Sequence, residues 1–271
     1  MATRLCVSAN VSSAFLFREV AYTVKRYEAA ADAGFKYMEC PSPYDVPETE
    51  LSALLSRLSL EQTLINSPVG TDVPTSRGYA CLSEEKARFM VSVQKACDYA
   101  QATNCKKIHI QSGLIPPNAD IHSCRRTFCQ NIRWAADLLH PHGITTLIEP
   151  INEYSIPGYF LSRFQQAVEI LDELRHPGVK LQLDLFHLQM AEGCLTKWIE
   201  KLLPLTGHIQ IAQAPNRHEP SYSGEMDYRY IFDLLRKLGY SGRIGLEYIP
   251  STDKTEDSLS WIEEYGLCKA C

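Results

Sequence analysis

Four side chains with oxygen donors stand in or just after short apolar segments of the chain. They are Glu149, Asp184, Gln210 and Glu247. If the four segments are neighbouring strands of a parallel barrel, their carboxyl ends meet at one face and the four oxygen donors converge there. Three carboxylates at one place repel each other, and a bound divalent cation is a common way to keep them ionised. The pattern therefore predicts a metal site.

The type of donor indicates which metal. Carboxylate and amide oxygens suit a hard ion such as Mg²⁺ or Mn²⁺ better than zinc, which prefers sulfur and nitrogen. Taken one at a time, each carboxylate could instead cap the next helix or pair with a Lys or Arg. A single cation is favoured because it explains all four residues together.

A cation beside carboxylates suits the removal of a proton next to a carbonyl group. The metal polarises the carbonyl and stabilises the enediolate, while a carboxylate takes the proton. This chemistry belongs to isomerases and epimerases. His187 and Arg217 could donate hydrogen bonds to a hydroxylated or anionic substrate. The alternative for each is structural: a histidine that only holds its neighbours, and a solvated loop arginine.

Strand-like and helix-like patterns alternate along the whole chain and would position these residues. Helical patterns cover, for example, 84–102 and 228–239. Eight strands are expected, at 4–9, 36–40, 63–67, 107–112, 145–150, 180–186, 208–214 and 243–248. Eight βα units in 271 residues average about 34 residues each. The sequence thus predicts an α/β protein with a single (β/α)₈ TIM barrel over 1–271; an open doubly wound sheet is the alternative.

Several of these strands alternate apolar with polar residues. Examples are 107–112, 180–186 and 208–214. Strands covered by helices put their apolar positions toward those helices, so the polar positions point into the barrel. A buried polar group without a partner costs roughly 1 to 3 kcal/mol. We therefore expect partners or a ligand inside the barrel.

Composition excludes several classes of protein. The net charge of −5 and isoelectric point near 5.9 give no broad attraction to nucleic acid or anionic lipid. No apolar run reaches the length of a membrane span, and MATRLCVSAN lacks the pattern of a secretory signal. We expect a cytoplasmic protein with reduced thiols among its ten cysteines. The one Cys-x-x-Cys pair, Cys268 and Cys271, is interpreted as part of a fraying tail.

Motifs of other enzyme classes are absent from the sequence. It contains no Gly-x-Gly-x-x-Gly, no Walker loop, no Gly-x-Ser-x-Gly elbow and no His-Glu-x-x-His. We therefore expect no nucleotide cofactor, and neither serine hydrolysis nor zinc-protease chemistry.

Motifs along nearly the whole chain resemble those of hydroxypyruvate isomerases, within the larger xylose-isomerase-like barrel group. The matching segments are MECPSPYD (38–45), RGYACL (77–82), IHIQSG (108–113), IEPIN (148–152), LQLDLFHLQ (181–189), HIQIAQAPNRHEP (208–220), GEMDY (224–228) and IGLEYIP (244–250). The resemblance implies carbohydrate metabolism and a reversible conversion of 3-hydroxypyruvate into 2-hydroxy-3-oxopropanoate (tartronate semialdehyde).

The resemblance also implies roles for individual residues. Glu149 and Glu247 match the glutamates that donate and accept the proton and also bind the metal. Asp184 and Gln210 match the remaining metal ligands; related sugar epimerases have histidine at the position of Gln210. Two further matches, His187 and Arg217, contact the substrate, with the arginine at its carboxylate. The epimerases carry another substrate-binding glutamate soon after the first one, a role that is not transferred to Glu153.

Other functions remain open on the sequence alone. A ketose 3-epimerase or another small-sugar isomerase would use the same carboxylates with a larger pocket. A phosphodiesterase of the endonuclease IV type would need more histidine and carboxylate ligands for zinc and a basic face. A catalytically silent barrel could serve as a binding protein. The expected partner is a small hydroxy-keto acid, and related proteins often form homo-oligomers.

Overall fold

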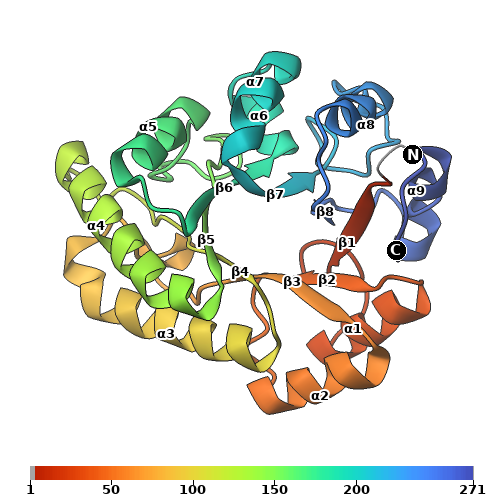
Figure 1. Ribbon diagram of the computed structural model, residues 1–271, viewed down its shortest axis with the longest axis horizontal. Coiled ribbons are helices and arrows are strands. Elements are labelled where there is room, and N and C mark those ends of the chain that lie inside the picture. The colour runs from red at the N-terminus through yellow and green to blue at the C-terminus, as the bar shows by residue number, and fades with distance from the viewer. Residues whose placement is uncertain (1–3, 271) are drawn as a thin grey trace.

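Eight parallel strands close into a barrel in a computed structural model that describes residues 4–270 (Figure 1). The strands are β1 (Cys6–Asn10), β2 (Tyr37–Cys40), β3 (Glu61–Asn66), β4 (Lys107–His109), β5 (Thr145–Ile148), β6 (Val179–Asp184), β7 (Thr206–Ile211) and β8 (Arg243–Leu246). Each strand pairs with the next along the chain, and β1 pairs with β8 from Cys6↔Arg243 to Ala9↔Leu246. The predicted TIM barrel is confirmed, and the open sheet is excluded because no strand of the ring is left at an edge.

Helices follow the strands and surround the ring on its outside (Figure 1). They are α1 (Thr23–Asp32), α2 (Glu48–Leu58), α3 (Lys86–Ala102), α4 (Ile121–Leu139), α5 (Phe164–Leu174), α6 (Leu185–Ala191), α7 (Leu195–Leu202), α8 (Tyr228–Lys237) and α9 (Trp261–Glu264). Each strand packs mainly against its two neighbours in the barrel. Each long helix buries an apolar stripe against the outside of the barrel.

The last long helix shows how the apolar pattern sets the packing. In α8 the side chains of Ile231, Leu234 and Leu235 are buried, as their helical spacing predicts. Leu238 was expected on the same face but is 37% exposed. It is the residue that caps the helix, so its side chain no longer follows the helical periodicity.

The ends of the strands differ from the sequence expectation by a few residues. β4 ends at His109, three residues early, while β7 begins at Thr206, two residues early. Leu185 and Phe186, expected in a strand, form the start of α6. The Asp184 side chain causes this change, since its Oδ1 accepts the backbone N–H of Phe186 at 2.8 Å and so caps the helix.

The carboxyl-terminal segment packs along β1 as far as Cys268. The backbone N–H of Val7 donates to the carbonyl of Cys268 at 2.9 Å, and Cys268 in turn donates to Leu5 at 3.1 Å. Cys268 is buried, so the prediction of a fraying tail is wrong at this position. Cys271 lies outside the described residues. Eight described cysteines are free thiols, whereas Cys6 is disulfide-bonded.

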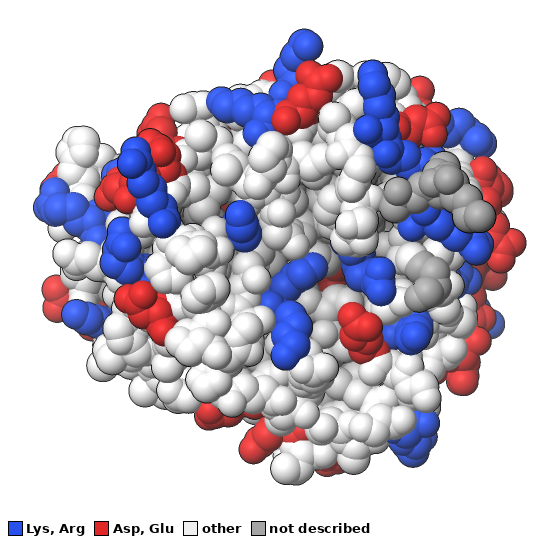
Figure 2. Space-filling view, viewed as in Figure 1, with Lys and Arg blue, Asp and Glu red and all other residues white. Residues whose placement is uncertain are grey.

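Within residues 4–270, no helix combines the length and apolar character that a membrane span requires. Figure 2 shows one face of the molecule, on which Lys and Arg side chains are interspersed with Asp and Glu. The surface seen there carries both signs of charge, in keeping with the small net charge of −5.

Candidate active site

A cavity of about 370 Å³ lies at the carboxyl ends of the strands and brings together most of the predicted site residues. Glu149 follows β5, Glu247 follows β8, and His187 stands in α6 directly after β6. Together with Arg217 these residues line the cavity. This is the face at which active sites of (β/α)₈ barrels are built. A cavity of this volume suits a small molecule.

Glu149 is buried and only half satisfied. Its Oε2 accepts a hydrogen bond from Nε2 of Gln182 at 3.0 Å. Its Oε1 has no hydrogen-bond partner within residues 4–270. Burial raises the pKa of Glu149 well above 4.5, and the charges of Glu247 and Asp184 raise it further. Because it takes up a proton more readily than an ordinary carboxylate, Glu149 is suited to general base chemistry.

A guanidinium group lies between the other two carboxylates. Nη2 of Arg217 donates to Oδ2 of Asp184 at 3.0 Å and to Oε2 of Glu247 at 2.5 Å. The arginine also stacks on Phe15 and Phe186, with ring centroids 5.0 and 4.7 Å from its Cζ. The positive charge of Arg217 thus offsets part of the repulsion between the carboxylates. The sequence analysis expected a metal ion alone to do this. Its ion pairs to Asp184 and Glu247 also occupy donors that were expected to meet a substrate carboxylate.

Glu247 has the properties of a second acid–base group. Its Oε1 accepts a hydrogen bond from Asn10 at 3.2 Å. Burial raises its pKa to about 8, although the charge of Arg217 acts in the opposite direction. A carboxyl group with this pKa holds a proton near neutral pH and can release it during a reaction cycle.

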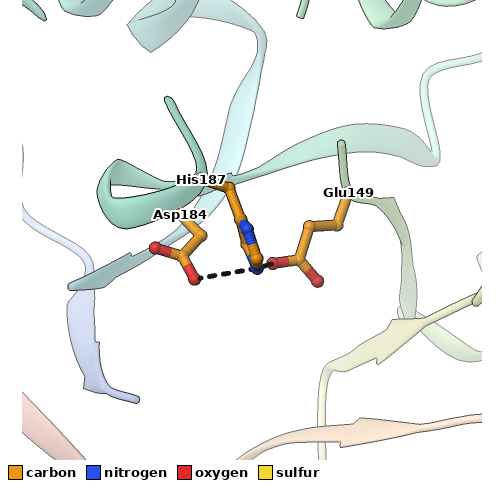
Figure 3. Close-up of side chains that lie close together, drawn as sticks. All are labelled: Glu149, Asp184 and His187. Atoms are coloured by element: carbon orange, nitrogen blue, oxygen red, sulfur yellow. Dashed lines mark ion pairs between the residues drawn. The ribbon is translucent and has the colours of Figure 1, made fainter. Parts of the chain in front are cut away.

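His187 is oriented by Asn152, a residue to which the sequence analysis assigned no role. Nδ2 of Asn152 donates to Nδ1 of His187 at 2.7 Å. The amide orientation follows from its neighbour, because Oδ1 of Asn152 accepts the backbone N–H of Ser155 at 2.9 Å. Nδ1 therefore acts as an acceptor, and Nε2 lies 3.6 Å from Asp184 and 4.0 Å from Glu149 (Figure 3). Burial and the charge of Arg217 keep the pKa of His187 well below 6.5.

Gln210 lies beneath the cavity and does not line it. Its Oε1 accepts from Gln182 at 2.6 Å, and its Nε2 donates to Oε2 of Glu39 at 2.8 Å. The other oxygen of Glu39 contacts Nε2 of His208 at 2.5 Å, and Nδ1 of that ring is 3.0 Å from Nζ of Lys107. We call this set of five residues, of which all but the partly exposed Lys107 are buried, the floor network. It places polar strand residues inside the barrel, as their alternation predicts.

The residues around Glu149 fit a divalent cation. Within the described part of the chain, Glu149, Asp184 and His187 offer ligand atoms that all lie within 4.8 Å of one another. Figure 3 shows the two carboxyl groups on either side of the imidazole. A buried carboxylate oxygen without a partner, Oε1 of Glu149, is the feature that a cation would complete.

Two more cavity residues had no role in the sequence analysis, although both stand in quoted motifs. His109 of IHIQSG is 1% exposed, and Arg77 of RGYACL is exposed at the margin. Burial lowers the pKa of His109 to about 3, so its ring is neutral. The polar alternation in β4 placed His109 inside the barrel, but only the three-dimensional structure places it beside Glu149.

The floor network predicts a pH dependence of stability. Burial raises the pKa of Glu39 from 4.5 to about 8. Between these values the folded protein keeps a proton that the unfolded chain releases, so stability falls as the pH rises. We expect wild-type protein to lose stability relative to Glu39→Gln between about pH 4.5 and pH 8, by up to about 1.4 kcal/mol per pH unit. Urea unfolding at pH 5, 6.5 and 8 measures this.

The control is Glu61→Gln, which changes an exposed glutamate of β3. Its unfolding free energy should track the wild-type value over the same range. Parallel curves for wild type and Glu39→Gln would contradict the prediction.

Known proteins resemble this chain over nearly its whole length. The model of the xylose isomerase-like TIM barrel family matches residues 27–265. A Danio rerio protein provisionally named hydroxypyruvate isomerase is 40% identical over 262 residues, which cover 95% of this chain and 94% of that protein. A 2-oxo-tetronate isomerase of Cupriavidus necator is 38% identical over 258 residues, covering 95% and 97%.

Solved structures agree with the fold. A Brucella melitensis crystal structure named as an AP endonuclease of family 2 is 40% identical, covers 97% of this chain and 99% of its own, and superposes with a TM-score of 0.91. A D-allulose 3-epimerase of Methylomonas sp. is 19% identical with a TM-score of 0.77, covering 98% and 100%, a likeness of fold alone. By its sequence and its closed barrel, the chain belongs to the xylose isomerase-like TIM barrel family.

Proposed function

We propose that this protein is an isomerase that interconverts 3-hydroxypyruvate and 2-hydroxy-3-oxopropanoate. The observation that carries the proposal is the pair of glutamates, Glu149 and Glu247, whose pKa values are both raised at a small cavity. Two carboxyl groups of this kind can exchange roles as proton acceptor and donor near neutral pH. The names of the relatives that are 37–40% identical support a small hydroxy-keto acid as the substrate.

In this proposal one glutamate removes a proton from C3 of hydroxypyruvate, and the resulting enediolate is protonated at C2. Glu149 and Glu247 share this work as the catalytic residues. His187 turns its Nε2 toward the substrate site, since Asn152 occupies its Nδ1. Arg217 contributes positive charge beside the enediolate, and its stacking on two aromatic rings holds the guanidinium in place.

We propose Glu149, Asp184, Gln210 and Glu247 as the ligands of a divalent cation, Mg²⁺ or Mn²⁺. When bound, such a cation polarises the substrate carbonyl and stabilises the negative charge that develops on its oxygen. Gln210 would have to exchange its hydrogen bond with Gln182 for the metal. Oε1 of Glu149 has no hydrogen bond to give up within the described residues, so Glu149 can bind the cation without losing a protein contact.

The test of the function is conversion of a defined substrate by metal-loaded protein. We expect hydroxypyruvate to give 2-hydroxy-3-oxopropanoate, with the product identified by NMR. A panel of ketoses tests the alternative of a ketose 3-epimerase, and an abasic-site DNA substrate tests a phosphodiesterase. Turnover of a ketose or of DNA, with hydroxypyruvate unchanged, would contradict the proposal.

Replacing either catalytic glutamate should abolish most of the activity. We expect Glu149→Gln and Glu247→Gln each to lower kcat by at least about 100-fold, because an amide cannot accept or release the proton. Circular dichroism and thermal unfolding check that the barrel persists. The matched control is Glu153→Gln, an exposed glutamate near Glu149 in the chain, which should retain activity. Near-normal turnover in either catalytic variant would rule out its assigned role.

Metal removal tests the ligand role, and Asp184 tests it at a residue that is not one of the acid–base groups. We expect chelation to lower activity and Mg²⁺ or Mn²⁺ to restore it. Calorimetry should show that Asp184→Asn weakens Mn²⁺ binding at least about tenfold, because the amide no longer offers a charged oxygen. Equal affinity in wild type and variant would exclude Asp184 as a ligand.

A further inference from the structure

The proposed isomerisation moves two protons, and the glutamate pair accounts for only one of them. In hydroxypyruvate C3 carries a hydroxyl group and C2 is the carbonyl; in the product C3 is the carbonyl and C2 carries the hydroxyl. One proton therefore travels from C3 to C2, and a second travels from the oxygen on C3 to the oxygen on C2. An epimerisation at a carbon next to a carbonyl requires no such transfer between oxygens.

We propose that His109 is the catalytic residue that carries the second proton, an assignment that rests on the proposed function. His109 ends β4 and lines the cavity, although only 1% of its surface is exposed. Its Nδ1 lies 3.4 Å from Oε2 of Glu149. Neither ring nitrogen has a hydrogen-bond partner within residues 4–270. A buried imidazole at a cavity with both nitrogens unpartnered is costly unless a bound molecule completes it.

Other titratable groups at the cavity are less suited to this transfer. Nδ1 of His187 is held by Asn152, and its Nε2 lies 3.2 Å from Nη1 of Arg217. The arginine cannot accept a proton, because a guanidinium has no free lone pair. In the floor network, His208 is held between Glu39 and Lys107 and does not line the cavity. His109 alone among these rings has both nitrogens unoccupied.

A neutral imidazole can complete the transfer without a net change in its own charge. The ring has one N–H and one nitrogen lone pair. The free nitrogen takes the proton of the hydroxyl on C3 and then passes it to the oxygen on C2, so the ring returns to its starting tautomer. The C3–H and O3–H bonds break, the C2–H and O2–H bonds form, and the carbonyl moves from C2 to C3. The atoms balance, and no further reactant is needed.

The test separates the two protons in deuterium oxide. The enzyme can abstract and return the C3 proton without the oxygen transfer, which leaves solvent deuterium at C3 of unconverted hydroxypyruvate. We expect His109→Gln to lower product formation by about 100-fold while deuterium uptake at C3 falls less than about threefold. Both rates are read by NMR from one sample, so their ratio does not depend on the amount of folded protein. Buffer without enzyme gives the background exchange.

The matched control is His187→Gln, which removes another buried imidazole near Glu149. There, and in Glu149→Gln, product formation and deuterium uptake should fall together. A parallel fall of both rates in His109→Gln, or unchanged product formation, would overturn the role of His109 while the isomerase function stands. If wild-type protein leaves hydroxypyruvate unconverted, the proposed function itself fails, and the role of His109 with it.

A second measurement needs no deuterium uptake. With hydroxypyruvate deuterated at C3, the isotope effect on kcat/KM should decrease toward unity in both His109→Gln and His109→Asn, because the oxygen transfer becomes the slow step. A structural role would reduce the rate and leave the isotope effect unchanged, and that result overturns the proposal.

Discussion

The burial of several carboxyl groups inside one barrel is the constraint on which the site depends. A buried carboxylate is costly unless charge or hydrogen bonds compensate it. Arg217 compensates Asp184 and Glu247 with a single nitrogen, while Glu149 keeps an oxygen without a partner among the described residues. The three carboxylates are therefore not equivalent. The one that the protein leaves incomplete is the one best placed to meet a cation or a proton from the substrate.

The floor network explains how the barrel keeps Glu149 in place. Gln182 donates from one nitrogen to both Glu149 and Gln210, so the positions of these two side chains are linked. Gln210 in turn donates to Glu39, against which β8 packs closely: a Cβ on Gly245 would lie only 2.1 Å from the Glu39 carboxylate. Glycine is needed there because any side chain would displace the buried acid. Strand packing at the base of the barrel is thereby coupled to the carboxylate at its mouth.

Much of this was predictable from the sequence. The spacing of apolar residues identified all eight strands, and the alternation of polar with apolar residues placed Gln182 and His208 inside the barrel. Both patterns could be used because they depend only on residues close together in the sequence. The partner of each side chain was not predictable, because it depends on contacts across the barrel. Arg217 illustrates this limit: the family resemblance implied a contact with a substrate carboxylate, and the sequence could not show that the arginine also pairs with Asp184 and Glu247. Gln210 was expected at the cavity and is found one layer below.

The same limit applies to the reaction. A barrel with 19% identity and a TM-score of 0.77 belongs to an epimerase, so the fold leaves the choice between epimerisation and isomerisation open. Either reaction can begin with the removal of a carbon-bound proton, so a glutamate at the cavity is compatible with both. The two reactions differ in that only isomerisation moves a proton from one substrate oxygen to another. Whichever side chain faces that oxygen decides the outcome, and on this chain β4 places an unpartnered imidazole next to Glu149.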